Sequence, residues 1–299
     1  MKHLLIMISL VSAISAFAQE KLAVVTTLST FADITSSIGG DALEVKYIAP
    51  PRFNPHFIEP KPGDILKLKR ADLFIHSGLD LEAWRDPLVT AAGRADLKVG
   101  GAKQLDLSSG IALLEVPSSQ PSRSEGDIHV FGNPHYWTDP RNGLIIAREI
   151  KDKLIEIVPA SAMVFNSNFA KFEEKLTAKI RDWQSMAQKK GTVALIAYHN
   201  QWPYLMNFLG YTTPKFLEPK PGIPPSPKQI EDLITYAKTT KIPAILQPSY
   251  FGKESSSELA EKIGAKLVIL CESVGELPEC SDYVSMIDHN VKSIVAALN

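Results

Sequence analysis

The chain has 299 residues, of which 45% are hydrophobic and 22% are charged. This is the composition of an ordinary soluble globular protein, and the length suits one large or two medium domains. The formal net charge is −1 and no block of basic residues occurs. An electrostatic footprint for nucleic acid or for an anionic membrane surface is therefore excluded, and we expect no nucleic-acid partner.

The first residues have the pattern of a secretory signal peptide. Lys2 gives a positive start, residues 4–11 are an almost unbroken apolar run, and Ala16-Phe17-Ala18 is a small-x-small cleavage site. We therefore expect a signal peptide over residues 1–18 and an exported, periplasmic mature chain that begins at Gln19. The apolar run is too short to span a bilayer, and no second run reaches the ~20 residues needed.

The first half of the chain alternates expected strands with expected helices, which predicts a parallel sheet of βαβ units. The strands are runs of apolar and β-branched residues, and the first helix has an apolar stripe that ends at two glycines. A segment rich in Ser, Pro and Gly follows and is expected to be an exposed loop. The expected positions are strands at 22–28, 43–49 and 73–76, helices at about 30–39, 64–70 and after Asn142, and the loop at 115–132.

The longest helical pattern covers residues 159–190. Apolar residues recur at steps of three and four, and Gly191 supplies a C-terminal stop. The stripe consists of Phe165, Phe169, Phe172, Leu176, Ile180, Trp183 and Ala187. At 1.5 Å per residue this helix is about 45 Å long, which exceeds what one lobe needs. We expect it to be a spine that joins two lobes.

After this helix the chain begins a second series of strands and helices. Strands are expected at 192–198, 242–247 and 266–270, with helices at 256–263 and 283–298. The predicted fold class is therefore α/β, with two parallel-sheet βαβ lobes joined by one long helix. The expected divisions are a signal peptide at 1–18, an N-terminal lobe at 19–158, a linking helix at 159–190 and a C-terminal lobe at 191–299.

An internal repeat supports two similar lobes. The segment Pro55-His56-Phe57-Ile58-Glu59-Pro60-Lys61-Pro62-Gly63 recurs as Pro214-Lys215-Phe216-Leu217-Glu218-Pro219-Lys220-Pro221-Gly222, with seven of nine residues identical. Each copy follows a strand-like segment. Because ligands of open α/β sheets bind outside the carboxyl ends of the strands, we expect each lobe to offer a rigid proline-rich loop to a shared cleft.

Three of the seven histidines, His56, His135 and His199, follow a strand or a rigid loop. Each has aromatic residues beside it and a proline within four positions, and stiff flanks suit a metal site whose ligands are held in place before the ion arrives. Three imidazoles favour Zn²⁺, whereas Mn²⁺ prefers more carboxylate oxygen. We therefore predict a zinc site, with manganese as the alternative, and no role as an enzyme.

The motifs around these histidines resemble those of the solute-binding proteins of zinc and manganese ABC transporters. They are Asn54-Pro55-His56 with Glu59-Pro60-Lys61-Pro62, Asn133-Pro134-His135-Tyr136-Trp137 with Asp139-Pro140-Arg141-Asn142, and Tyr198-His199-Asn200. The resemblance covers essentially the whole mature chain. It implies two α/β lobes joined by a single long helix, a metal buried between them, and a membrane permease of an ABC transporter as the partner. We expect the protein to be a monomer.

The fourth ligand stays open. The family often places an aspartate after the last strand, where this chain has Cys271-Glu272, and the histidine-rich loop of many zinc-binding members is reduced here to His129. Glu218 and Glu272 are the possible oxygen ligands, with Cys271, water or an accessory His129 as alternatives. In an exported chain, however, Cys271 and Cys280 are expected to form a disulfide, which would remove the thiolate.

The predicted function is an exported receptor that captures a divalent transition metal, with zinc favoured, and delivers it to an ABC-type permease. The alternative is an exported zinc hydrolase in which three histidines hold the ion and a water is activated on it. The hydrolase would need a general base beside an open cleft, and the chain has no HExxH or similar paired motif. The receptor therefore accounts better for the three separate histidine motifs.

Overall fold

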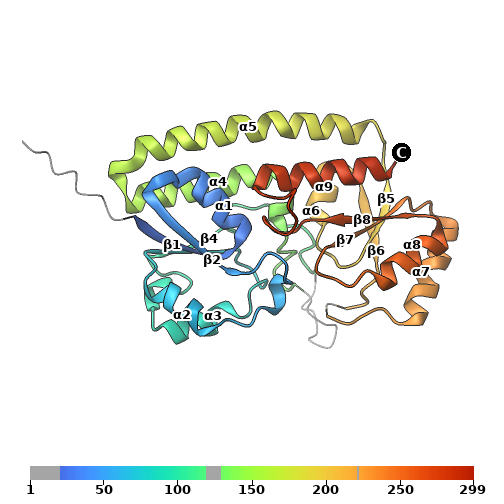
Figure 1. Cartoon of the computed structure of the whole chain (residues 1–299), viewed down its shortest axis with the longest axis horizontal. Helices are drawn as coiled ribbons and strands as arrows, with labels where there is room; N and C mark the ends of the chain where they lie inside the picture. Colours follow the sequence, from blue (N-terminus) through green and yellow to red (C-terminus); the bar gives the residue numbers. More distant parts are fainter. Residues whose placement is uncertain (1–20, 119–128, 221) are drawn as a thin grey trace, which may run out of the picture.

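The computed structural model describes residues 21–118, 129–220 and 222–299, and the predicted signal peptide lies outside these ranges. Two four-stranded sheets, both parallel throughout, form the centres of two lobes (Figure 1). The first has the order β2-β1-β3-β4 and the second β6-β5-β7-β8. The strands are β1 Leu22–Leu28, β2 Leu43–Ala49, β3 Leu73–His76, β4 Gln104–Asp106, β5 Ala194–Ala197, β6 Thr212–Phe216, β7 Ala244–Pro248 and β8 Lys266–Leu270.

The predicted fold class is confirmed, because two parallel α/β lobes are joined by one long helix. The helices are α1 Ser29–Gly39, α2 Pro62–Lys69, α3 Arg85–Ala92, α4 Pro140–Ile157, α5 Ala162–Gln188, α6 Pro203–Leu209, α7 Pro227–Thr239, α8 Glu254–Ile263 and α9 Tyr283–Ala297. Within the described ranges, none of them has both the length and the apolar character needed to cross a bilayer. The division of the chain into domains at residues 158 and 190 stays a prediction.

The expected strands that are apolar throughout match the structure closely, whereas two edge strands were not expected. β4 has only three residues, all half-buried. β6 is largely exposed and contains Pro214, which lacks a backbone N–H donor. Both strands lie at the edge of their sheets, where burial is low and proline is tolerated. Neither strand therefore carries the apolar signal by which the buried strands were recognised.

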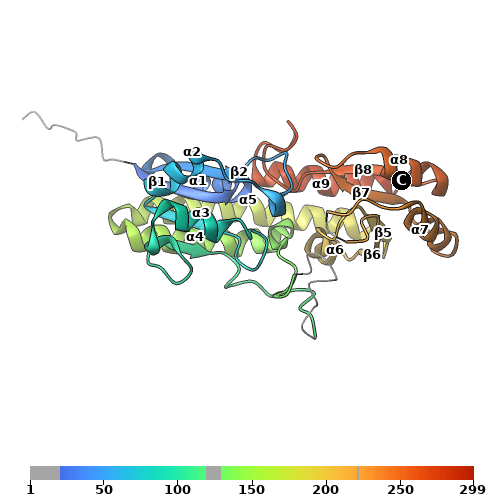
Figure 2. The ribbon, with the colours of Figure 1, turned by 90° about the horizontal axis from the view of Figure 1, so that it is seen from below.

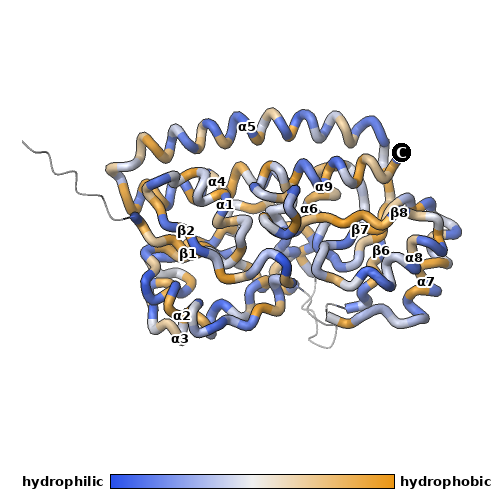
Figure 3. Tube along the Cα trace, viewed as in Figure 1, coloured by the Kyte–Doolittle hydropathy of each residue, from blue (hydrophilic) through white to orange (hydrophobic). Residues whose placement is uncertain are grey.

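The joining helix α5 has 27 residues. All seven apolar residues of its predicted stripe are buried, which confirms the helical interpretation. The helix begins three residues later than expected because Pro159–Ser161 form a 3₁₀ turn before it. In Figure 3 the tube of α5 alternates between hydrophobic and hydrophilic colours along its length, as an amphipathic helix on a surface does.

Helix α5 covers both lobes. It packs on α1 and α4 of the first lobe and on α6 and α9 of the second. The turned view in Figure 2 shows the lobes end to end along the long axis, with α5 extending past the boundary between them. One apolar core consequently runs through both lobes, while a second, smaller core lies in the second lobe and includes residues of α7 and α8.

The segment between β8 and α9 ties the second lobe to the start of α1. Ser29 Oγ donates to the Val274 carbonyl oxygen at 2.8 Å, and Val274 N donates to Thr30 Oγ1 at 3.1 Å. The Tyr283 backbone N donates to Asp33 Oδ2 at 2.8 Å. A disulfide between Cys271 and Cys280, as expected for an exported chain, closes this segment. These contacts, together with the continuous core, connect the two lobes.

If the shared core under α5 stabilises the whole molecule, Leu176→Ala should lower the free energy of unfolding by about 2–5 kcal/mol, since Leu176 is fully buried at mid-helix. The matched control is Met163→Ala in the same helix, which should change the stability by less than about 0.5 kcal/mol, because Met163 is 86% exposed. Urea unfolding followed by circular dichroism measures both. Equal effects of the two variants would contradict the packing described for α5.

Candidate metal centre

Two of the predicted histidines, His56 and His135, are held by the same type of turn. Each belongs to an Asn-Pro-His triplet, and the asparagine side chain accepts a hydrogen bond from the histidine backbone N, at 3.0 Å for His56 and 3.1 Å for His135. This is an Asx turn, and the proline between the two residues stiffens it. His56 lies in the 3₁₀ turn Pro55–Phe57 after β2, and His135 directly precedes the 3₁₀ turn Tyr136–Thr138 before α4.

The aromatic residues after His135 anchor it to both lobes. Tyr136 Oη donates to the Ser77 carbonyl oxygen of the first lobe at 2.6 Å. Trp137 Nε1 donates to the Glu272 carbonyl oxygen of the second lobe at 2.8 Å. Both rings are fully buried. The imidazole of His135 therefore starts from a backbone that is fixed in the interface between the lobes.

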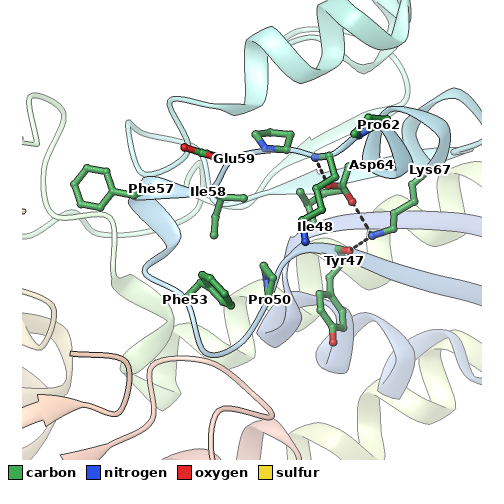
Figure 4. A pocket seen from close by; sticks show the side chains of 12 residues that line it. Tyr47, Ile48, Pro50, Phe53, Phe57, Ile58, Glu59, Pro62, Asp64 and Lys67 are labelled. Carbon is green, nitrogen blue, oxygen red and sulfur yellow. Dashed lines mark hydrogen bonds and ion pairs between the residues drawn. The ribbon is translucent and has the colours of Figure 1, made fainter. Parts of the chain in front are cut away.

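His199 lies just after β5, at the carboxyl end of the second sheet. Its Nδ1 lies 2.6 Å from Glu218 Oε2, and Glu218 is the carboxylate of the second copy of the internal repeat. The carboxylate of the first copy, Glu59, contacts none of the described histidines in this way. It is exposed and lines a pocket between the 50–63 loop and β2, together with Phe53, Ile58 and Lys67 (Figure 4).

The structure brings His56, His135 and His199 together, and it adds His129 to the cluster. One nitrogen from each of the four rings lies within 4.8 Å of the others. The Nε2 atoms of His56 and His135 are 3.2 Å apart, and the ring centroids of His135 and His199 are 5.8 Å apart. First-lobe and second-lobe residues thus meet at one point between the sheets.

Three carboxylates stand behind the rings rather than among the converging nitrogens. Glu272 Oε1 lies 2.7 Å from His135 Nδ1, and Glu218 Oε2 is at hydrogen-bond distance from His199 Nδ1. Asp80 Oδ1 lies 3.1 Å from His129 Nδ1. The contacts to His129 and His199 are hydrogen bonds that engage Nδ1 and leave Nε2 as the nitrogen that can coordinate an ion, whereas His135 Nδ1 and Glu272 Oε1 are close without a hydrogen bond. Glu218 therefore orients a histidine, and Glu272 lies beside one.

Burial favours the neutral form of two of the rings, His56 and His135. Loss of hydration lowers the pKa of His56 and of His135 well below the ordinary histidine value, and the neighbouring imidazoles lower it further. Burial raises the pKa of the Glu272 carboxyl to about 6. Neutral imidazoles are the form that binds a cation.

The donor set fits a small divalent metal ion. Within the described part of the chain, Nε2 of His129 and Nε2 of His199 are buried and have no hydrogen-bond partner. The nitrogens of the four rings are at most 4.8 Å apart. A zinc ion bound tetrahedrally at 2.0–2.1 Å from each nitrogen would place them about 3.3 Å apart, so each separation has to shorten by no more than about 1.5 Å. A second cluster, Cys271, Cys280 and His289, offers no thiolate because its cysteines are bonded to each other.

Sequence reasoning missed the residues that support the rings. Asp80 holds His129, while Gln201 and Tyr250 donate to the Glu272 carboxylate. A signal for Asp80 was present, because it comes four residues after the end of β3, at the edge where parallel strands place functional side chains. Gln201 and Tyr250 had the same signal, since they come four residues after the end of β5 and two residues after the end of β7.

Comparison with known proteins gives one family and a set of relatives. Residues 24–297 match the family model described as the periplasmic component A of a zinc-uptake complex, ZnuA. The manganese ABC transporter substrate-binding lipoprotein PsaA of Streptococcus pneumoniae is 27% identical over 95% of this chain and 91% of its own length. The iron-binding protein YfeA of Yersinia pestis is 28% identical over 92% of this chain and 86% of its own.

Solved structures give the same fold. A crystal structure of ZnuA superposes with a TM-score of 0.79 at 22% identity and covers 94% of this chain and 100% of its own. The manganese-bound periplasmic metal binding protein from Candidatus Liberibacter asiaticus has a TM-score of 0.75, also at 22% identity, with the same coverage. At this identity the superposition establishes the architecture of two lobes and a joining helix.

The internal repeat offers a matched test of the carboxylates behind the rings. Glu218→Ala removes the partner of His199 Nδ1 and should weaken zinc binding by about 10–100-fold, the usual cost of losing such a support. Glu59→Ala removes the equivalent carboxylate of the first copy, which is exposed, and should leave the affinity unchanged. Competition titration against a chromophoric chelator measures both. The geometry of the centre would be contradicted if the two variants bound zinc alike.

Proposed function

The chain belongs to the zinc-uptake component A family of metal-binding receptors for ABC transporters, and from this premise we propose that it captures zinc in the periplasm and delivers it to a membrane permease. The observation that carries the proposal is the convergence of buried imidazoles between the lobes. His56 supplies a nitrogen from the first lobe, His135 supplies one from the edge of that lobe, and His199 supplies one from the second lobe. An ion bound by all three connects the two lobes.

The choice of zinc rests on the chemistry of the donors. The relatives named above are described as manganese or iron proteins and the family as one of zinc uptake, so relationship alone leaves the metal open. Imidazole nitrogen suits zinc, whereas manganese prefers carboxylate and water oxygen. Here Glu218 and Glu272 face the Nδ1 atoms of histidines. A nitrogen-rich set with its carboxylates in supporting positions favours zinc over manganese.

The family also bears on the rival function and on the compartment. The receptor family is one of transport components, and the alternative of an exported zinc hydrolase receives no support from it. We place the mature chain in the periplasm as a monomer, with residues 1–18 as a cleavable signal peptide. Several relatives are described as substrate-binding lipoproteins of transporters, which agrees with an exported protein.

The core shared by the lobes limits how capture and release take place. Closing two hinged domains over a ligand requires a boundary that can open, and here α5 and the Val274 contacts cross that boundary. Loading and release therefore involve a small tilt and movement of the site loops.

Because the movement of the lobes is restricted, removal of zinc should change the overall size of the protein very little. The radius of gyration from small-angle X-ray scattering should agree to within about 0.5 Å between zinc-loaded and chelator-treated protein, because packed cores do not deform continuously. A clear expansion on removal of zinc would contradict the single rigid frame.

A melting curve recorded on the same samples should show a cooperative transition without metal, since a receptor stays folded when empty.

Zinc affinity should depend on pH in a definite direction. Protons compete with the ion for imidazole nitrogen, so affinity falls as pH falls. Because burial lowers the pKa of His56 and His135, this loss should lie below the ordinary histidine value of about 6.5. Binding should be weaker at about pH 5 than at about pH 7.5. Isothermal titration in buffers of known proton enthalpy checks this, and equal affinity at the two pH values would contradict coordination by imidazole.

A further inference from the structure

One histidine of the cluster comes from outside the three motifs. His129 lies six residues before His135, on the far side of the turn that leads into the Asn-Pro-His triplet. Its ring stacks on His56 with centroids 5.1 Å apart and planes inclined by 24°, and its centroid is 5.8 Å from that of His135. The His129 side chain is 12% exposed. Its Nε2 atom is buried and, among the described residues, has no hydrogen-bond partner.

Asp80 sets the orientation of the His129 ring. One carboxylate oxygen lies 3.1 Å from His129 Nδ1, and the other accepts a hydrogen bond from the Val130 backbone N at 2.9 Å. A carboxylate that binds both the ring and the next backbone N–H fixes the side chain and its backbone together. With Nδ1 engaged, Nε2 is the nitrogen left to face the other imidazoles.

The backbone that presents Asp80 is unusual. Gly78 and Leu79 both have positive φ, at 70° and 54°, and a non-glycine residue seldom adopts this region. The same turn is tied to the centre, because the carbonyl oxygen of Ser77 accepts the hydrogen bond from Tyr136 Oη beside His135. Such backbone strain concentrates at functional sites. The turn thus connects the support of His129 to the segment that carries His135.

The carboxylates expected as alternative ligands have contacts of their own. Glu272 Oε2 accepts hydrogen bonds from Gln201 and Tyr250, whereas Oε1 lies 2.7 Å from His135 Nδ1 and, among the described residues, has no hydrogen-bond partner. Glu218 contacts His199 Nδ1 with Oε2 and accepts from the Gly222 backbone N with Oε1. To coordinate the ion, Glu218 would have to give up a buried hydrogen bond, and Glu272 lies outside the group of converging ligand atoms. His129 Nε2 has no such bond to break.

We propose that His129 is the fourth metal ligand, held by Asp80, and that it completes a four-imidazole site which selects zinc over manganese. The inference rests on the proposed function, since it assumes that His56, His135 and His199 hold the transported ion. Four neutral nitrogens match the tetrahedral preference of zinc, whereas manganese loses the oxygen ligands that it favours. The carboxylates behind the His129, His135 and His199 rings compensate the charge of the ion and raise the basicity of those rings.

The experiment compares four variants of the mature chain. His129→Ala removes the ligand, Asp80→Ala removes its support, His56→Ala tests the proposed function, and His289→Ala is the control, since His289 lies on α9 outside the four-histidine cluster. Two readouts are used. Competition titration gives the zinc and manganese affinities, and the visible absorption of the cobalt-substituted protein reports how many nitrogen ligands surround the metal.

We expect His129→Ala to weaken zinc binding by about 10–100-fold and to change manganese binding by less than about 3-fold, so that the zinc preference falls. Its cobalt spectrum should shift, because an oxygen ligand replaces a nitrogen. Asp80→Ala should weaken zinc binding about 10-fold while keeping the spectrum of the unchanged protein. His289→Ala should behave as the unchanged protein.

Two results separate failure of this inference from failure of the proposed function. If His129→Ala keeps both the zinc affinity and the cobalt spectrum while His56→Ala loses zinc, the four-imidazole site is overturned and the receptor function stands. If His56→Ala also keeps full zinc affinity, the proposed function itself is wrong. Melting curves of each variant without metal identify any loss that comes from misfolding.

Discussion

The close packing of four imidazoles against one another between the two lobes is the interaction on which the rest of the site depends. Protonated rings this close together would repel one another, and burial favours the neutral form of two of them by lowering the pKa of His56 and His135. Carboxylates behind His129 and His199 hold the Nδ1 atoms and turn the opposite nitrogens inward, and a third carboxylate, Glu272, lies beside His135 Nδ1. The arrangement leaves buried nitrogen atoms whose hydrogen-bonding capacity a cation would satisfy.

The frame around this interface explains how such a costly cluster is kept in place. Helix α5 and the segment after β8 cross between the lobes, and a single apolar core runs beneath them. Trp137 and Tyr136 attach the His135 segment to the second and the first lobe, respectively. The proposed ligands are therefore positioned before an ion arrives, and the energy that would be needed to order them is supplied by folding.

Much of the fold could be predicted because it depends on local patterns. Strands β1, β2, β3 and β8 are apolar runs, or alternate along the chain, and they were expected with the observed bounds. The period of the stripe in α5 identified a helix longer than one lobe requires. The edge strands β4 and β6 escaped prediction because they are short or exposed and carry little apolar signal.

The sequence by itself determined the two α/β lobes, the joining helix and the three histidine motifs, because the period of apolar residues and stiff Asn-Pro-His turns are properties of short segments. Only the tertiary structure decided that Glu218 and Glu272 stand behind histidines and that His129 joins the cluster. These contacts unite residues from separate loops. Their distances follow from how two sheets pack on α5, and no spacing along the chain encodes that packing.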